Sequence, residues 1–269
     1  MSDEVYPRAP VQFVTFEVQY PMTPAFAKPE GKEVVYDQLA EQFPLLEALN
    51  SVQIQFGVGD AAPPMPIPQP GSEIRMTNRH RTTSVTVGPA IVRIEQAAHT
   101  QFSDLRDLIT EVLEAVESAA RIHGIQRATL RYIDEIQHPD GTSPAAWKGL
   151  VHEGLVGPVD LLEDMQPVVT EGSILFQPDP QHLVRVAYGA HPAGTFAVDP
   201  NGPLRIRPRS PGAFFRLDTE STWVAPPDEV PPLIVADVVE LADRLHEPVS
   251  AVFEATLTPQ LRDFIRTPA

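Results

Sequence analysis

A histidine and a glutamate stand side by side near the end of a long amphipathic stretch, at His246 and Glu247. An imidazole next to a carboxylate can act as a general base or bind a metal ion. The chain continues with Pro248 and Val249, so the two-histidine pattern of zinc-dependent hydrolases is absent. The plainer interpretation is a histidine at the C-terminus of a helix, where the helix dipole favours it, with its neighbour in solvent.

Three polar residues, Arg131, Tyr132 and Asp134, interrupt a stretch that is typical of a buried strand, Ala128–Ile136. Because side chains alternate along a strand, Arg131 and Asp134 are predicted to face opposite sides and not to form a simple pair. A buried Asp134 would need hydrogen-bond partners, or its pKa would be raised. The three residues are candidate binding residues, and the alternative is a structural polar group near a strand end.

Two clusters of arginine stand out against an acidic background. The first contains Arg75, Arg79, His80 and Arg81, and the second contains Arg205, Arg207 and Arg209, with Arg216 nearby. Guanidinium groups suit phosphate and carboxylate, so these clusters predict an anion site or a contact with an acidic partner. The alternative is that solvated arginines pair with the many carboxylates of the same chain.

Other signals of catalysis are missing from the sequence. The histidines His99, His138, His152, His182 and His191 are dispersed and show no ligand spacing. There is no cysteine, G-x-S-x-G elbow, phosphate loop or dinucleotide fingerprint. We therefore expect no metal ion and no cofactor, and we favour a protein that is not an enzyme.

Composition narrows the class of protein. The 269 residues carry a formal net charge of −16, which repels nucleic acid and anionic membrane at long range. The 30 prolines predict stiff loops and short elements. The N-terminus has no signal-type apolar core, and no apolar run is long enough to span a bilayer. These features favour a cytoplasmic protein that does not bind membranes.

The stretch Phe102–Ile136 predicts one long helix followed by a central strand. Apolar residues recur at spacings of three and four, namely Leu105, Leu108, Ile109, Val112, Val116, Ala119 and Ala120. Gly124 is expected to end this helix in the left-handed conformation. From Ala128 the period changes from 3.6 to 2, which indicates a strand.

The remaining elements are predicted in the same way. The strands are expected at Val11–Tyr20, Ser51–Val58, Glu73–Asn78, Thr83–Val87, Ile91–Gln96, Val168–Gln177, His182–Gly189, Leu204–Arg207 and Ala213–Asp218. The helices are expected at Val34–Phe43, weakly at Ser143–Met165, at Pro231–Leu245 with a break at Pro248, and in a last short turn from Thr258 to Ile265. A proline-rich loop is expected at Asp60–Gly71.

The two halves of the chain repeat the same order of elements, a strand, a helix, several strands and a long helix. This order predicts an α+β protein built from two similar units, residues 1–125 and 126–269, each with an antiparallel sheet packed against a long helix. The units are expected to pack closely and could form one globular domain. The alternative is a single sheet that grips a helix.

Several phrases match a known family in order and spacing. They are the strand after Pro10, the run TTSVTVGPAIVRIEQ, the strand LRYIDEI and the C-terminal LHEPVSAVFEATLTPQLRDFI. Over nearly its whole length the chain resembles a family of bacterial and archaeal proteins known only for its sporadic distribution and without an assigned function. The resemblance implies a shared fold, but it implies no activity, cofactor or catalytic residue.

These observations rank three functions. The first is a protein-binding accessory or regulatory factor, which a flat apolar patch on an exposed sheet face or edge would favour. The alternative is a small-molecule or nucleotide-binding protein, possibly an enzyme, with a pocket between sheet and long helix. A pocket lined by Arg131, Tyr132 or Asp134 would favour this alternative. Nucleic-acid binding comes third because only the arginine clusters suggest it, and the oligomeric state is left open.

Overall fold

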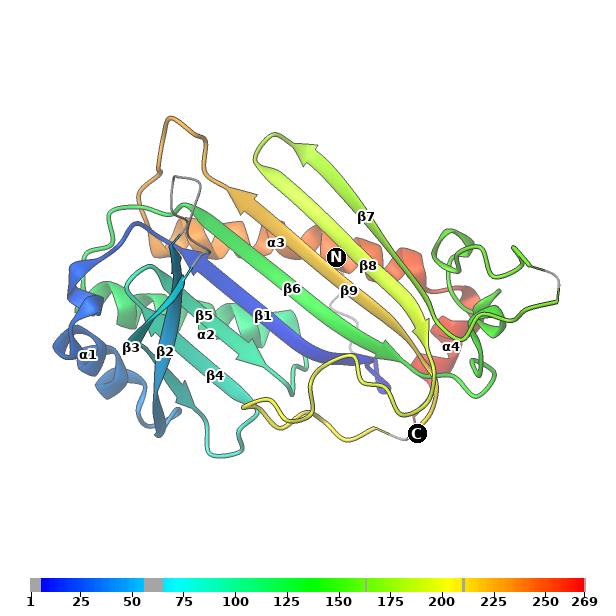
Figure 1. Ribbon diagram of the computed structural model, residues 1–269. Helices are drawn as coiled ribbons and strands as arrows, with labels where there is room; N and C mark the ends of the chain where they lie inside the picture. Colours follow the sequence, from blue (N-terminus) through cyan, green and yellow to red (C-terminus); the bar gives the residue numbers. More distant parts are fainter. Residues whose placement is uncertain (1–5, 56–64, 163, 210, 269) are drawn as a thin grey trace.

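A single antiparallel sheet of nine strands, covered on one face by helices, forms the framework of the protein (Figure 1). The computed structural model describes residues 6–55, 65–162, 164–209 and 211–268. The strands are β1 (Val11–Gln19), β2 (Leu45–Gln55), β3 (Met65–Thr77), β4 (Thr83–Gly88), β5 (Ile91–Gln96), β6 (Arg127–Ile136), β7 (Thr170–Asp179), β8 (His182–His191) and β9 (Phe214–Val224). The helices are α1 (Pro29–Leu39), α2 (Phe102–Ala119), α3 (Val235–Thr256) and α4 (Pro259–Arg266).

The sheet is continuous across the middle of the sequence. Its strand order is β2-β3-β4-β5-β1-β6-β9-β8-β7, and β1 pairs antiparallel with β6 along most of its length. The prediction that Ala128–Ile136 forms a central strand is therefore confirmed. The strand β7 lies at one edge of the sheet, and among the described strands it pairs only with β8.

The long helix α2 forms where the apolar spacing predicted it. Leu105, Ile109, Val112 and Val116 are almost fully buried, and they pack into the main core against the sheet. The helix ends at Ala119 rather than at Gly124, so that prediction of the helix end was wrong. A β-carbon on Gly124 would lie 2.6 Å from the Val230 side chain, so close packing against the segment before α3 explains the glycine.

The helix α3 lies beside α2 on the same face of the sheet (Figure 1). It runs without interruption through Pro248 to Thr256, which corrects the predicted break at that proline. Leu245 and Val249, on either side of Pro248, are buried against the core. We attribute the continuity to this packing, which offsets the cost of one missing backbone hydrogen bond.

Several weaker predictions need correction. In the predicted helical region Ser143–Met165, the described residues form only two 3₁₀ turns, Pro144–Trp147 and Glu153–Leu155, and the predicted strand Leu204–Arg207 is irregular. The strand β2 begins six residues before the predicted start, and α1 begins five residues before its predicted start. The strand β3 already begins at Met65, inside the predicted proline-rich loop. Residues 56–64, which include parts of that loop and of the predicted strand Ser51–Val58, lie outside the described residues.

A second cluster of buried side chains closes the far end of the helix-covered face. Trp147 and Phe215 are fully buried there, with their ring centroids 5.4 Å apart. Leu261 and Ile265 of α4 belong to the same cluster. The predicted final turn of helix is thus confirmed as α4, and it fixes the end of the sheet against which the C-terminal part of α3 rests (Figure 1).

Candidate functional site

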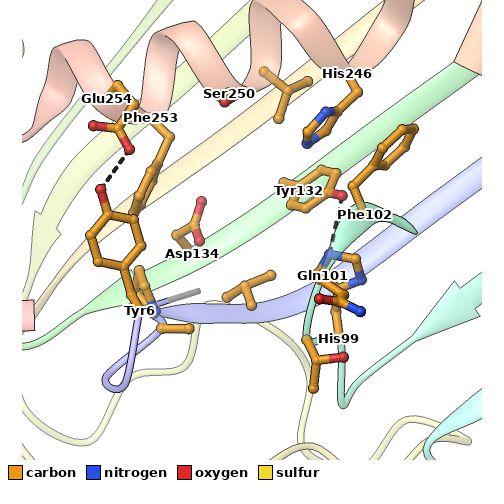
Figure 2. Close-up of a pocket in the computed structure, with 15 residues that line it drawn as sticks. Tyr6, His99, Gln101, Phe102, Tyr132, Asp134, His246, Ser250, Phe253 and Glu254 are labelled. Atoms are coloured by element: carbon orange, nitrogen blue, oxygen red, sulfur yellow. Dashed lines mark hydrogen bonds between the residues drawn. The ribbon is translucent and has the colours of Figure 1, made fainter. Parts of the chain in front are cut away.

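A cavity of about 140 Å³ lies between the centre of the sheet and the middle of α3. Its floor is formed by β1 and β6, one wall by residues 99–102 before and at the start of α2, and its roof by α3 (Figure 2). The helical repeat explains the roof, because His246, Ser250 and Glu254 recur every four residues on one side of α3. Tyr132 and Asp134 alternate with outward residues on β6 and project into the same space.

The carboxyl group of Asp134 is the least compensated polar group of this cavity. Asp134 is only 6% exposed, and no donor among the described residues, in side chain or main chain, forms a hydrogen bond with its carboxyl group. Burial raises the pKa of Asp134 to about 7, with Arg209 opposing the rise and Asp218 adding to it. The group therefore exchanges a proton in the neutral range, which is unusual for an aspartate.

An irregularity in strand pairing lies beside Asp134 at the edge of the cavity. The register between β1 and β6 shifts between Val11 and Phe13, which pair with Asp134 and Ile133. The extra residue, Gln12, makes this a β-bulge, a feature that often re-directs side chains beside functional sites. The bulge ends the regular pairing where the cavity begins.

His99 and Tyr132 line the opposite side and are hydrogen-bonded to each other (Figure 2). The hydrogen-bonded chain continues from His99 to Gln96, which lies outside the cavity lining. The Nδ1 of His99 lies 2.9 Å from Oε1 of Gln96, which can only accept, so we assign the proton of His99 to Nδ1. The Nε2 atom then accepts from the Tyr132 hydroxyl at 3.2 Å. Burial, followed by the nearby His246, lowers the pKa of His99 to about 4, so this imidazole is neutral near pH 7.

Aromatic side chains form much of the remaining wall. The ring of His246 stacks on Phe102 with centroids 3.9 Å apart and planes 1° apart. Tyr6 meets Phe253 edge to face at 5.8 Å. The Tyr6 hydroxyl donates to Glu254 at 2.6 Å, and Arg262 forms an ion pair with the same carboxylate at 3.0 Å. The charge of Glu254 is thus compensated within the protein.

The structure brings three of the candidate residues together and separates the others from them. Tyr132, Asp134 and His246 line the cavity, whereas Glu247 is exposed on the outer side of α3. His246 lies in the middle of a helix, so its placement at a helix C-terminus was wrong. Arg131 faces the other side of the sheet, where it forms two hydrogen bonds of 2.7 and 2.8 Å with Asp218.

The two arginine clusters contact each other through main-chain atoms, but their side chains do not form a common site. The amide of Arg205 donates to the carbonyl of Arg81 at 2.7 Å, and Arg81 has a positive φ of 55°. Arg75 lies 3.8 Å from Glu47. The side chains of Arg79, Arg81, Arg205 and Arg207 are exposed. This dispersed arrangement is the one expected for arginines that pair with the chain's own carboxylates or face solvent.

Tyr6, His99, Phe102 and Glu254 also line the cavity, although nothing in their local sequence singled them out. Their contacts join segments far apart in the chain, and Tyr6 and Glu254 are separated by 248 residues. One signal could have helped. The polar residues His246, Ser250 and Glu254 repeat at a spacing of four within an otherwise apolar helix face.

Comparison with known proteins adds no assignment. No protein-family model matches the chain, and no curated protein matches it. Within the described residues, no helix is long and apolar enough to cross a membrane. The same residues contain no group of three or more histidine, cysteine, aspartate or glutamate side chains arranged to hold a metal ion.

Proposed function

We propose that this protein binds a small molecule in the cavity between β6 and α3. One observation carries the proposal. The carboxyl group of Asp134 is buried at the cavity wall, and no hydrogen-bond donor among the described residues contacts it. Burying a polar group without a hydrogen bond costs free energy, and native proteins rarely retain such a group without a reason. A ligand that donates to Asp134 supplies this reason.

The cavity volume also indicates the size of the ligand part that fits inside it. About 140 Å³ is close to the volume of a cavity known to hold a single benzene ring, and it is well below that of typical drug-sized sites. A nucleotide is therefore too large to be enclosed. The mixture of aromatic walls and a few polar groups suits a ligand of about ring size with one or two polar atoms.

Filling the cavity tests this function directly. Ser250→Met places a longer side chain in the cavity, while Ala251→Met adds a side chain of the same length on the exposed side of the same helix. Small molecules that remain bound to freshly purified protein would be identified by mass spectrometry. We expect the wild type and Ala251→Met to retain the same compound and Ser250→Met to lose it. Equal retention by both variants would contradict a ligand site here.

A second function, binding of a partner protein, is favoured by the edge strand β7. Its middle is apolar and exposed on both faces, with Leu175 64% and Phe176 48% exposed, and Val168 just before it is 72% exposed. Natural edge strands usually carry charges or prolines that prevent pairing. The strand β7 has them at its ends, in Glu171, Pro178 and Asp179, but its middle, Gly172–Phe176, has neither. We propose that an extended segment of a partner protein adds to this edge as a further strand.

Charge at the edge tests this second function. Leu175→Lys should abolish capture of a specific partner from native lysate, while Val34→Lys, on the exposed side of α1, should not. Partner capture that survives Leu175→Lys, or a wild-type protein that pairs only with itself in light scattering, would contradict the proposal.

We also propose that the two halves of the chain descend from one duplicated unit. Each half contributes its first strand to the centre of the sheet, β1 or β6, with its last strand, β5 or β9, directly beside it. In each half the last strand is followed by a long helix, α2 or α3, and the second half adds the short helix α4. Superposition of the halves should align these pairs of elements in the same sequence order. The cytoplasmic location is likewise a proposal, with which the absence of cysteine is compatible, and cell fractionation tests it.

A further inference from the structure

We propose that the ligand of this cavity is a small organic cation that carries an N–H group, such as a protonated amine. The inference depends on the proposed ligand-binding function and specifies the ligand class. It follows from the charges at the cavity wall, the aromatic surfaces around them and the single carboxyl group without a donor.

The charge balance of the cavity favours a cation. No lysine or arginine lines it among the described residues, and His99 is neutral near pH 7. The other imidazole of the lining, His246, is stacked on Phe102 and disfavours a positive charge on His99. The Glu254 carboxylate is already compensated by Arg262 and by the Tyr6 hydroxyl. Asp134 is therefore the acidic group left for a ligand, and an ammonium N–H provides both the donor and the opposite charge that this carboxylate lacks.

The nearest outside cation does not take that role. Arg209 acts on Asp134 through its charge, but its guanidinium donates to the main-chain carbonyl of Ala9 at 2.7 Å and does not line the cavity. An anionic ligand is disfavoured because the negative charge of Asp134 would repel it. The α2 N-terminus, which could attract an anion, is faced by Asp104, which accepts hydrogen bonds of 2.8 Å from Thr100 and Gln101.

Aromatic rings surround the space in front of Asp134 (Figure 2). Tyr6 and Phe253 lie on one side of the carboxyl group, and Tyr132 and Phe102 lie on the other. Aromatic faces attract a cation and also cover its alkyl or aryl part, and this attraction strengthens when water is excluded. A carboxylate between aromatic walls is the arrangement that protein sites use to recognise ammonium groups.

Three compounds of matched shape test the inference, namely benzylamine, benzyl alcohol and benzoate, which carry a positive, a neutral and a negative group on the same ring. Calorimetric titration at about pH 8, where Asp134 is ionised, would use the wild type, Asp134→Asn and Glu247→Gln. Glu247→Gln removes one negative charge from the exposed side of α3 and leaves the cavity lining unchanged. Ser250→Met reports whether binding occurs in the cavity.

We expect the wild type and Glu247→Gln to bind benzylamine about tenfold to a hundredfold more tightly than benzyl alcohol, and benzoate most weakly. Asp134→Asn should lose this preference while Ser250→Met loses binding of all three. If benzyl alcohol or benzoate binds as tightly as benzylamine, and Ser250→Met still abolishes binding, the cation inference fails while the ligand site stands. If none of the three binds to the wild type, both proposals fail.

Discussion

Two aspartates on neighbouring strands, Asp134 on β6 and Asp218 on β9, are buried on opposite faces of the same sheet. In the register between these strands Asp134 pairs with Leu217 and Ile133 pairs with Asp218, so the two aspartates are diagonal neighbours. They are 6% and 3% exposed. Asp218 lies within 4 Å of three arginines, whereas Asp134 has no donor among the described residues. The two carboxyl groups are similarly buried, but among the described residues only Asp218 is held by arginines, as a structural carboxylate should be. This contrast supports the proposal that Asp134 is kept for a ligand.

On the face of the sheet that no described helix covers, three arginines compensate the buried carboxylate of Asp218. Arg131 holds Asp218 with two hydrogen bonds, while Arg185 lies 3.7 Å and Arg216 3.9 Å from it. All three arginine side chains are partly exposed, so each keeps part of its hydration while the carboxylate is shielded. Sequence reasoning treated Arg131 as a candidate binding residue, but this network gives it a structural role.

A large effect is expected from the loss of the arginine-bound carboxylate. Asp218→Ala leaves three arginines without their shared partner, and breaking such a network should lower the free energy of unfolding by about 3 kcal/mol, a value reduced for their partial exposure. Urea denaturation at about pH 8 measures it. If Asp218→Ala is less destabilising than Asp134→Ala, the contrast between a stabilised Asp218 and an uncompensated Asp134 is contradicted.

Replacing the other aspartate, Asp134, should raise the free energy of unfolding rather than lower it. Burial raises the folded-state pKa of Asp134 to about 7, above the unfolded-state value of about 4. The folded protein then binds the proton more tightly, so its free energy of unfolding falls as the pH rises from about 4 to about 7. Asp134→Asn removes this loss, and we expect it to be more stable than wild type without ligand by about 2–4 kcal/mol at about pH 8.

At about pH 4 the same variant should differ little from wild type, because the carboxyl group is then protonated in the folded state and already about half protonated in the unfolded state. Denaturation curves at the two pH values provide this internal control. A variant that is less stable than wild type at the higher pH would mean that Asp134 has a stabilising partner inside the protein.

A smaller effect concerns His99, whose pH dependence runs the other way. Burial lowers its folded-state pKa to about 4, below the unfolded-state value of about 6.5. The folded protein therefore loses stability as the pH falls from about 6.5 to about 4. His99→Gln should flatten this loss by about 1–3 kcal/mol, and His80→Gln, on an exposed turn, should leave it unchanged. A wild-type slope that survives His99→Gln would assign the loss to another group.

The sequence correctly predicted those helices and strands whose buried face follows from the spacing of apolar side chains. The apolar spacing of Leu105–Val116 and the alternation from Ala128 placed α2 and β6, because side-chain periodicity decides which face is buried. Where packing outweighs local preference the prediction was wrong. Pro248 was expected to break a helix that continues because Leu245 and Val249 bury against the core.

The same reasoning could identify only some of the residues that line the cavity. Asp134 and Tyr132 could be selected because a polar residue in a central strand needs a reason. His99 and Tyr6 could not, since their significance arises from contacts with Tyr132 and Glu254 that only the fold creates. The β-bulge beside Asp134 also depends on pairing between β1 and β6, which no local pattern encodes.

The most direct test of the central claim is a carbon-13 NMR titration of the Asp134 carboxyl group, with and without benzylamine. We predict a pKa near 7 in the free protein, followed by a fall on addition of benzylamine, because a bound cation stabilises the charged carboxylate. Glu247→Gln should show the same behaviour. A pKa in the ordinary range near 4 that benzylamine does not change would contradict the claim that Asp134 is buried without a partner and kept for a cation.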